Sequence, residues 1–301
     1  MFNLGNKGAV PTRPSSVVAG APQMATLSEP LFERLSRIIY DASGIHLKEA
    51  KRQMVQSRLT ARLRALNLNN FEDYVAVLAE HPGEMTQMLN RITTNKTYFF
   101  REPKHFETLR DVVLPSLLNN PKRGGDRVIK GWCAASSTGE EPYSIAMVLA
   151  EFMASNPAWS AKLLASDLDT NVLAKARAAA YPKQELPSIP DALRRKYAID
   201  GASDVPNTFR ICPEVADRVQ FRQINLMGAR YPISSKLDFI FCRNVFIYFT
   251  REDRDNVVRR FIDLLAPGGT MFLGHSEVLD INDFGGRLKF VGNTSYQKVI
   301  P

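Results

Sequence analysis

The order of the apolar segments predicts an α/β protein in which a parallel sheet carries helices on both faces. A strand-like segment at residues 127–133 is followed by a helical one at 143–154, and the same order recurs at 237–242 and 253–266. Such alternation is typical of parallel strands joined by crossover helices. The last segment, 288–299, alternates apolar and polar residues around Gly-Asn, which predicts a terminal antiparallel hairpin.

The first part of the chain predicts a separate all-α domain over residues 27–92, because it has helical periodicity and no strand pattern. Ser28 can cap the first helix, Gly44 can end it, and Asn70 can cap a later helix. We expect helices over about 29–43, 48–66, 71–80 and 84–92. Residues 1–26 contain three prolines with scattered Gly and Ser, and we expect them to form a flexible tail.

Residues 93–301 are expected to form the domain that contains the sheet. A helix at about 104–118 opens it, and a strand, a helix and a further strand are expected at 162–166, 170–180 and 270–275. Residues 182–220 are rich in Pro and do not fit the alternation, so we expect them to form an inserted subdomain.

Composition narrows the class of protein. The chain has 301 residues, of which 45% are hydrophobic and 23% charged, as in ordinary folded proteins. The net charge of +8 suggests an acidic partner: nucleic acid, anionic lipid or an acidic protein surface. The three cysteines are widely spaced and form no CxxC pair, which argues against a disulfide framework or a zinc site and for a reducing cytoplasm. No apolar run is long enough to cross a membrane, and no signal peptide is evident.

Polar residues follow the predicted strands, at the sheet edge where ligands bind in open parallel sheets. A small loop with Gly139 follows the first strand and could bring backbone N–H groups to a ligand. Asp167 follows the second strand, where an acidic residue can hold ribose hydroxyls or, alternatively, cap the next helix. The chain has neither a GxGxxG loop nor a phosphate-binding loop with its Lys, which argues against dinucleotide and nucleoside triphosphate chemistry.

The segment TTNKTYFFR, residues 93–101, joins the two expected domains. Taken alone, it reads as a linker with Phe99 and Phe100 packed in the core. Together with STGEEPYSIAM, SDLD, NL, FCRNVFIYF and GHSE, however, it resembles the chemotaxis receptor methyltransferases of the CheR type. The motifs occur in that family's order and cover about residues 30–300. The resemblance implies a class I S-adenosylmethionine-dependent methyltransferase fold with an N-terminal helical domain and a small β-subdomain insertion.

The resemblance also implies an activity and a partner. The family methylates glutamate side chains on the cytoplasmic helices of methyl-accepting chemoreceptors, and S-adenosylhomocysteine is the product of its cofactor. No metal, nucleic acid or membrane insertion is expected. The implied cofactor contacts are Asn95, Thr97, Arg101, Glu141 (with Glu140 as an alternative), Asp167, Asn225, Leu226, Arg243 and Asn244.

The chemistry of the cofactor suggests what some of these side chains do. Asp167 can accept both ribose hydroxyls, and an acidic residue near Gly139 can pair with the amino group of the methionine part. Arg101 can pair with the carboxylate of that part or orient the incoming glutamate, and Tyr248 can orient the same glutamate or wall the site. We assign Arg101 and Tyr248 to catalysis. A general base is unnecessary, because a glutamate with a pKa near 4.3 is already ionised at pH 7.

The second predicted helix is basic and lacks acidic residues over 51–67. At about 100° per residue, Lys51, Arg58 and Arg62 lie within about 40° of each other beside an apolar stripe. These residues alone would suggest a solvated face. The family places receptor recognition on this helix, so we expect Arg58, Arg62 and Arg64 to contact the substrate.

Two other functions remain open from the sequence. A nucleic-acid methyltransferase would fit the fold and the basic charge, but the segment at the end of the strand 237–242 reads CRNVFIYF and lacks the proline of the Asn/Asp-Pro-Pro-aromatic motif. A cofactor-sensing adaptor without catalysis would also retain the pocket, although Arg101, Asp167 and Asn244 argue against it.

Overall fold

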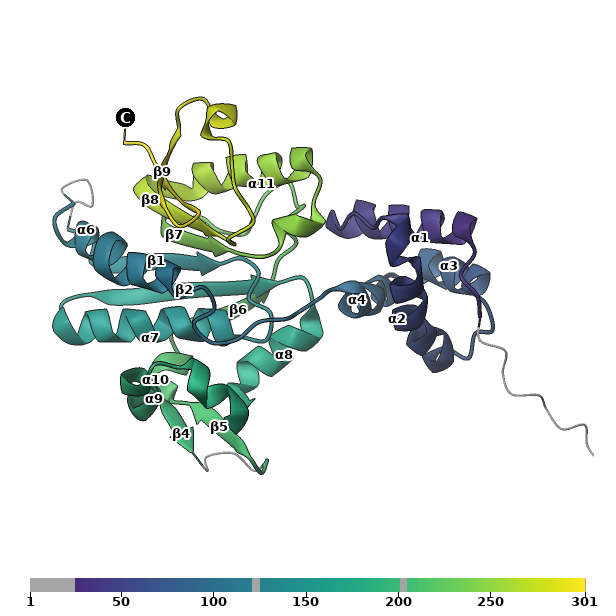
Figure 1. The fold of residues 1–301 in the computed structure, drawn as a ribbon, viewed down its shortest axis with the longest axis horizontal. Coiled ribbons are helices and arrows are strands. Elements are labelled where there is room, and N and C mark those ends of the chain that lie inside the picture. Colours follow the sequence, from purple (N-terminus) through teal and green to yellow (C-terminus); the bar gives the residue numbers. More distant parts are fainter. Residues whose placement is uncertain (1–24, 121–124, 201–204, 301) are drawn as a thin grey trace, which may run out of the picture.

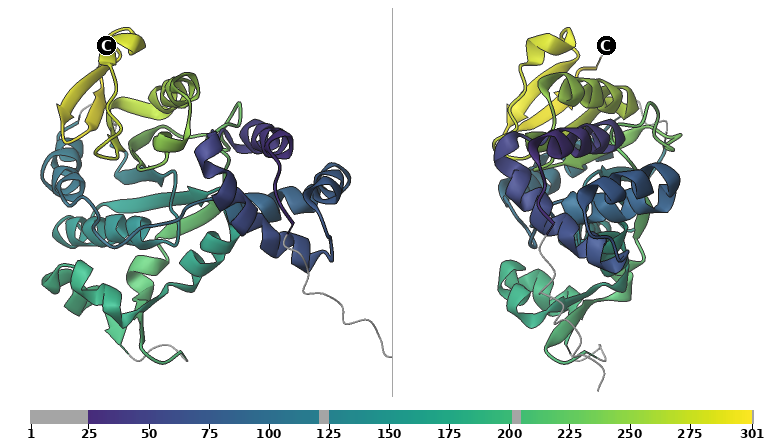
Figure 2. Two further views of the ribbon diagram at one scale, coloured as in Figure 1. Left: turned by 45° about the vertical axis from the view of Figure 1, so that its right-hand side comes forward. Right: turned by 90° about the vertical axis from the view of Figure 1, so that its right-hand side faces the viewer.

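The computed structural model describes residues 25–120, 125–200 and 205–300. It has an N-terminal helical domain beside a larger domain with a central sheet (Figure 1). A small second sheet and the C-terminal hairpin lie at opposite ends of the larger domain (Figures 1 and 2). Most of the expected tail, 1–24, lies outside the described residues. No helix among the described residues is long and apolar enough to span a membrane.

The N-terminal domain contains α1 (Glu29–Ser43), α2 (Arg52–Ala65), α3 (Phe71–Glu80) and α4 (Pro82–Ile92). Gly44 ends α1 with φ 73°, a conformation that glycine adopts at little cost. Asn70 caps α3 by accepting the N–H of Asp73 at 2.8 Å, as expected. Ser28 takes the N-cap position of α1, but its side chain makes no capping bond, so that expectation is wrong. A short 3₁₀ turn, Glu49–Lys51, precedes α2, which therefore starts later than expected.

The central sheet has seven strands in the order β6-β2-β1-β7-β8-β10-β9. The strands β6, β2, β1, β7 and β8 are parallel, and β10 pairs antiparallel with β8 and β9, which confirms the terminal hairpin. The bounds are β1 Val128–Cys133, β2 Ser160–Asp167, β6 Val219–Gln223, β7 Leu237–Cys242, β8 Leu265–Leu273, β9 Leu288–Gly292 and β10 Ser295–Lys298.

Helices cover both faces of the sheet, as the sequence predicts. On one face, Phe106, Met147 and Leu173 belong to one buried cluster, whereas Val258 and Phe261 pack with the other face. The helices are α5 Lys104–Thr108, a π-helical segment Leu109–Val113, α6 Leu114–Leu118, α7 Glu140–Ser155, α8 Thr170–Ala178 and α11 Arg251–Leu264. The layers leave the carboxyl ends of the parallel strands facing the helical domain (Figure 1).

The insertion differs from its expected bounds of 182–220. Its three-stranded antiparallel sheet has the order β3-β5-β4. The elements are β3 Ala180–Pro182, a 3₁₀ helix Lys183–Ser188, α9 Asp191–Tyr197, β4 Ala198–Asp200, β5 Thr208–Ile211 and α10 Pro213–Ala216. Residues 219 and 220 were expected to close the insertion, but they are the first residues of β6, which pairs with β2 in the central sheet.

Candidate functional site

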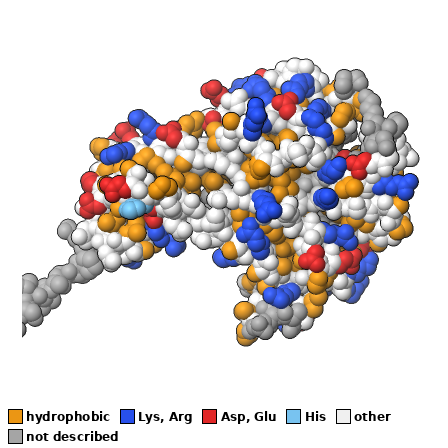
Figure 3. Space-filling model, turned by 180° about the vertical axis from the view of Figure 1, so that it is seen from behind, with side chains coloured by type: hydrophobic (Ala, Val, Ile, Leu, Met, Phe, Trp, Pro, Cys, Tyr) orange, Lys and Arg blue, Asp and Glu red, His pale blue; other side chains and the backbone are white. Residues whose placement is uncertain are grey.

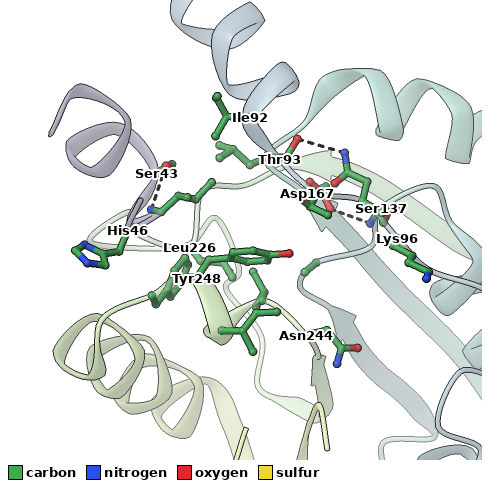
Figure 4. A pocket seen from close by; sticks show the side chains of 18 of the residues that line it. Ser43, His46, Ile92, Thr93, Lys96, Ser137, Asp167, Leu226, Asn244 and Tyr248 are labelled. Carbon is green, nitrogen blue, oxygen red and sulfur yellow. Dashed lines mark hydrogen bonds between the residues drawn. The ribbon is translucent and has the colours of Figure 1, made fainter. Parts of the chain in front are cut away.

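A cavity of about 740 Å³ lies between the two domains, at the carboxyl ends of the parallel strands. The helical domain contributes the segment after α1 and one face of α2, and the larger domain contributes the loops after β1, β2, β6 and β7. Figure 4 shows side chains from both domains converging on it. The cavity contains all nine expected cofactor contacts and Tyr248 in its lining.

The loop after β1 depends on a glycine. Gly139 has φ 102°, and an added Cβ would lie 2.5 Å from the Tyr181 hydroxyl and 2.9 Å from Cβ of Ala176. Both the conformation and the close packing therefore require glycine here. This loop turns directly into α7, so Ser137 and Glu141, the second residue of α7, line the cavity.

Asp167 is a buried carboxylate at the end of β2. It accepts the N–H of Ser137 at 2.8 Å and the N–H of Asp169 at 3.0 Å. Burial raises its pKa, and the two backbone bonds oppose that rise. The helix cap is instead Asp169, which accepts the N–H of Asn171 at the start of α8. The alternative interpretation of Asp167 as the cap is therefore wrong, and its remaining lone pairs can face a ligand.

Arg243 forms a buried ion-pair network. Its guanidinium lies 2.8 Å from Glu141 Oε2 and 3.0 Å from Glu102 Oε2, and the side chain is fully buried. Burial raises the pKa of Glu141, although Arg243 opposes the rise. Glu140 instead accepts from the Thr138 hydroxyl and is absent from the cavity lining, so the geometry favours Glu141 as the acidic group near a ligand.

Beside this network, three side chains lie close enough together to be considered as metal ligands. Glu102, His105 and His275 place one ligand atom each within 4.8 Å of the others. Arg243 already lies 3.0 Å from the carboxylate of Glu102, so a guanidinium takes the place where a cation would bind. Burial lowers the pKa of His105 to about 4, and the neighbouring Arg243 adds to this effect.

The loop after β7 is held by a second buried carboxylate, Glu277. Its oxygens accept the N–H groups of Asn244 at 2.9 Å, Phe246 at 2.8 Å and Gly274 at 2.6 Å. Asn244 has φ 58°, a conformation that asparagine tolerates better than most residues. This loop directs Tyr248 into the cavity, with its hydroxyl toward the side formed by Asp167 and Asn244 (Figure 4).

The segment that joins the domains carries three expected contacts. Arg101 donates to the carbonyl of Lys96 at 3.0 Å and lies 5.9 Å from the centre of the Tyr98 ring. Asn95 and Thr97 also line the cavity, but the Asn95 amide donates to Asp169 at 2.8 Å. Phe99 and Phe100 are buried, which confirms the packing expected of a linker.

Two further expected cofactor contacts, Asn225 and Leu226, lie on the loop after β6. Asn225 donates to the carbonyl of Ala42 at 2.7 Å and accepts the N–H of Met227. It therefore ties this loop to the helical domain while it lines the cavity. Leu226 is buried beside it and supplies an apolar wall.

The three expected substrate arginines have different surroundings. Arg58 donates to the carbonyls of Ile92 and Thr93, where α4 ends, and lines the cavity. Arg62 makes two bonds to the carboxylate of Glu84, at 2.8 and 2.6 Å. Arg64 is exposed and has no partner among the described residues. From behind, Lys and Arg side chains are spread over both domains rather than gathered in one patch (Figure 3).

Three further residues line the cavity that the sequence did not assign to the site. Lys48 and Lys51 add positive charge to the lining, and His46 approaches from the helical domain. Lys51 belongs to the basic face predicted for the second helix, whereas no local pattern distinguishes Lys48 and His46 from other surface groups. Glu277 lies in the quoted motif GHSE, so the motif was a signal for it.

The strand order and the cavity at the carboxyl ends of the strands define a class I methyltransferase fold with an added all-α domain. Residues 30–93 match the family "CheR methyltransferase, all-alpha domain", and residues 95–296 match "CheR methyltransferase, SAM binding domain". The chain therefore belongs to the CheR methyltransferase family.

Curated relatives agree with this family. The chain is 40% identical over 272 residues to the chemotaxis protein methyltransferase of Escherichia coli (strain K12), covering 89% of this chain and 91% of that one. It is 40% identical to chemotaxis protein methyltransferase 2 of Pseudomonas aeruginosa, covering 89% and 93%. It is 36% identical to the chemotaxis protein methyltransferase of Borreliella burgdorferi, covering 88% and 93%.

Proposed function

We propose that this methyltransferase transfers the methyl group of S-adenosylmethionine to glutamate side chains on the cytoplasmic helices of chemoreceptors. The observation that carries the proposal is the composition of the interdomain cavity. Carboxylates at the strand ends suit the cofactor, and the lining also includes Arg101, Lys48 and Lys51, which suit an anionic acceptor. The reaction would take place in the cytoplasm, where the receptor helices lie.

The cofactor would lie along the strand ends. Asp167 would accept the ribose hydroxyls, and Leu226 with Asn225 would contact the adenine. Glu141 would face the amino group of the methionine part, and Arg243 would hold Glu141 in place through their ion pair. Asn95 and Thr97 would close the cavity from the linker.

The methyl transfer is a direct displacement. An oxygen of the glutamate carboxylate attacks the methyl carbon, the carbon–sulfur bond breaks, and its electron pair stays on sulfur. The products are a neutral ester and S-adenosylhomocysteine, so no proton has to move. The protein's task is alignment, which can lower the barrier by roughly 7–11 kcal/mol. Arg101 and Tyr248 would orient the carboxylate as it sheds water.

The helical domain would select the substrate. Arg64 is exposed on α2 and is free to meet a Glu-rich helix. Arg58 supports this surface indirectly, because it is bound to the linker carbonyls. Arg62 is held by Glu84, and its part in substrate binding would also be indirect.

The test uses S-adenosylmethionine with a labelled methyl group and membranes that contain chemoreceptors. Label that is released as methanol by mild base identifies a carboxyl ester, and we expect this outcome. Asp167→Ala should abolish transfer, and exposed Glu252→Gln on α11 serves as the matched control. Base-stable label on RNA or DNA would favour the nucleic-acid alternative. Cofactor binding without transfer to any acceptor would favour the adaptor.

A further inference from the structure

One buried carboxylate, Asp169, connects the two domains. Its Oδ2 accepts the Thr93 hydroxyl at 2.9 Å and the Asn95 amide at 2.8 Å, and both donors lie in the segment that leaves the helical domain. Its Oδ1 accepts the N–H of Asn171 at 2.8 Å and so caps α8. Asp169 is only 2% exposed, so these charge-assisted bonds are shielded from water.

Asp169 also contacts the carboxylate at the candidate ribose site. Its N–H donates to Asp167 Oδ1 at 3.0 Å, and Asp167 Oδ2 accepts the N–H of Ser137 at 2.8 Å. The Ser137 hydroxyl in turn donates to the carbonyl of Asn95 at 3.0 Å. Four residues from three segments thus close a ring of hydrogen bonds. A shift of the linker must break a bond to Asp169 or move Asp167.

A second pair of bonds holds the helical domain at the same place. The Asn90 amide, near the end of α4, donates to the Thr170 hydroxyl at 2.9 Å. The Thr170 N–H returns a bond to the Asn90 side-chain oxygen at 3.1 Å. The helical domain therefore contacts the N-terminus of α8 at Thr170, one residue after Asp169. Figures 1 and 2 show α4 beside α8.

We propose that Asp169 is a positioning residue that couples docking of the helical domain to binding of S-adenosylmethionine. The proposal rests on the placement of the ribose at Asp167 and adds a link to the domain that selects the substrate. A bound ribose fixes Asp167, the ring then fixes Asn95 and Thr93, and the helical domain is held over the cavity. Because coupling is reciprocal, a docked domain also tightens cofactor binding.

The first variant is Asp169→Asn. Its oxygen can still cap α8, but its amide nitrogen then faces the Asn95 amide, and two donors oppose each other. We expect the affinity for S-adenosylhomocysteine, measured by calorimetry, to fall by about tenfold or more. Lys96 is exposed in the linker, and we expect trypsin to cleave after it faster in the variant than in the wild type. In the wild type, S-adenosylhomocysteine should slow this cleavage.

The rescue variant exchanges the two residues, Asn95→Asp with Asp169→Asn, and re-forms the pair with donor and acceptor reversed. We expect it to bind S-adenosylhomocysteine more tightly than the two single variants predict by addition. The matched control is Asp280→Asn. Asp280 caps the 3₁₀ helix Ile281–Phe284 in the same way, through the N–H of Asn282, and is absent from the cavity lining. It should change neither readout.

The outcomes separate this inference from the proposed function. A wild-type protein that does not bind S-adenosylhomocysteine would overturn the proposed function. A wild-type protein that binds it, together with an Asp169→Asn variant of equal affinity, would overturn the coupling alone. Equal cleavage after Lys96 with and without ligand, or strictly additive effects in the exchanged pair, would also overturn the coupling. Melting curves of each variant, which report its fold, keep these outcomes distinct from unfolding.

Discussion

Glu277 holds Asn244 in a left-handed backbone conformation by accepting its N–H at 2.9 Å. The two residues are 33 positions apart, on loops that follow β7 and β8. Burial raises the pKa of the Glu277 carboxyl, and its bonds from the backbone N–H groups oppose the rise. The two carboxylate oxygens thereby accept three backbone N–H groups that have no other partner among the described residues. The position of Tyr248 depends on this turn.

The variant Glu277→Gln tests this dependence. Glutamine has only one acceptor oxygen, so at least one of the N–H groups of Asn244, Phe246 and Gly274 loses its partner and faces an amide N–H₂. We expect the free energy of unfolding to fall by about 2 kcal/mol and kcat to fall by roughly tenfold. Urea unfolding and receptor methylation measure the two effects. Glu252→Gln, at an exposed site, should change neither, and a full-activity Glu277→Gln protein would contradict the assignment.

A second prediction separates Arg62 from Arg64. Arg62 pairs with Glu84, which also accepts the Tyr74 hydroxyl at 2.9 Å, and the Arg62 side chain is 15% exposed. Arg62→Ala leaves a buried carboxylate without its cation, so we expect the free energy of unfolding to fall by about 2 kcal/mol. Arg64→Ala should leave stability unchanged and raise the KM for receptor.

The measurements for this pair are urea unfolding and initial rates at varied receptor concentration. An Arg62→Ala protein of normal stability with a raised KM for receptor would mean that Arg62 contacts the substrate directly. An Arg64→Ala protein with an unchanged KM would remove Arg64 from the substrate surface.

The sequence predicted the layers because their signals are local. Strands such as 237–242 are apolar except for Asp238, and Gly44 or Asn70 act through their immediate neighbours. The start of the strand Val219–Gln223 was assigned to the insertion, because the strand is short and has only one buried residue. Its partner β2 is distant in the chain, so only the folded sheet identifies it.

The candidate site was predictable as a set of positions but not as a set of partners. The spacing placed Arg62 and Arg58 on one helix face. No local pattern indicated that the Arg62 guanidinium would bind Glu84, or that the Arg58 guanidinium would bind the carbonyl of Thr93. Likewise, the motif SDLD offers two carboxylates that are two residues apart. Only the backbone geometry shows that Asp169 caps the helix and leaves Asp167 for the cavity.

A third prediction concerns pH and His105. Its pKa is about 4 in the folded protein, against an ordinary value of about 6.5. Between these values the unfolded chain binds more protons, so stability rises with pH and is lost as pH falls from about 6.5 to 4. The full effect is about 3 kcal/mol. The titratable groups that face the ring are Glu102, Arg243 and His275.

The measurement is urea unfolding between pH 4 and 7 for the wild type and His105→Gln. The glutamine nitrogen can still donate to the carbonyl of Asn293, as His105 Nε2 does. Several buried carboxyls have raised pKa values and give the opposite slope, so the difference between the two proteins is the relevant quantity. We expect that difference to shrink as pH falls. Parallel curves for the two proteins would show that His105 does not titrate in this range.

A last prediction concerns the Tyr248 hydroxyl, which reaches into the cavity and has no hydrogen-bond partner among the described residues. If it orients the acceptor carboxylate, Tyr248→Phe removes one donor from the reacting group and leaves the ring as a wall. We expect kcat to fall by about 10²-fold, as for the loss of one donor to a reacting oxygen, while the affinity for S-adenosylhomocysteine stays within about twofold. Tyr248→Ala, which also removes the wall, should weaken S-adenosylhomocysteine binding as well. Single-turnover methylation and calorimetry separate the two roles: an unchanged kcat in Tyr248→Phe would reduce Tyr248 to a wall of the cavity, and a large loss of affinity in the same variant would place the hydroxyl on the cofactor instead.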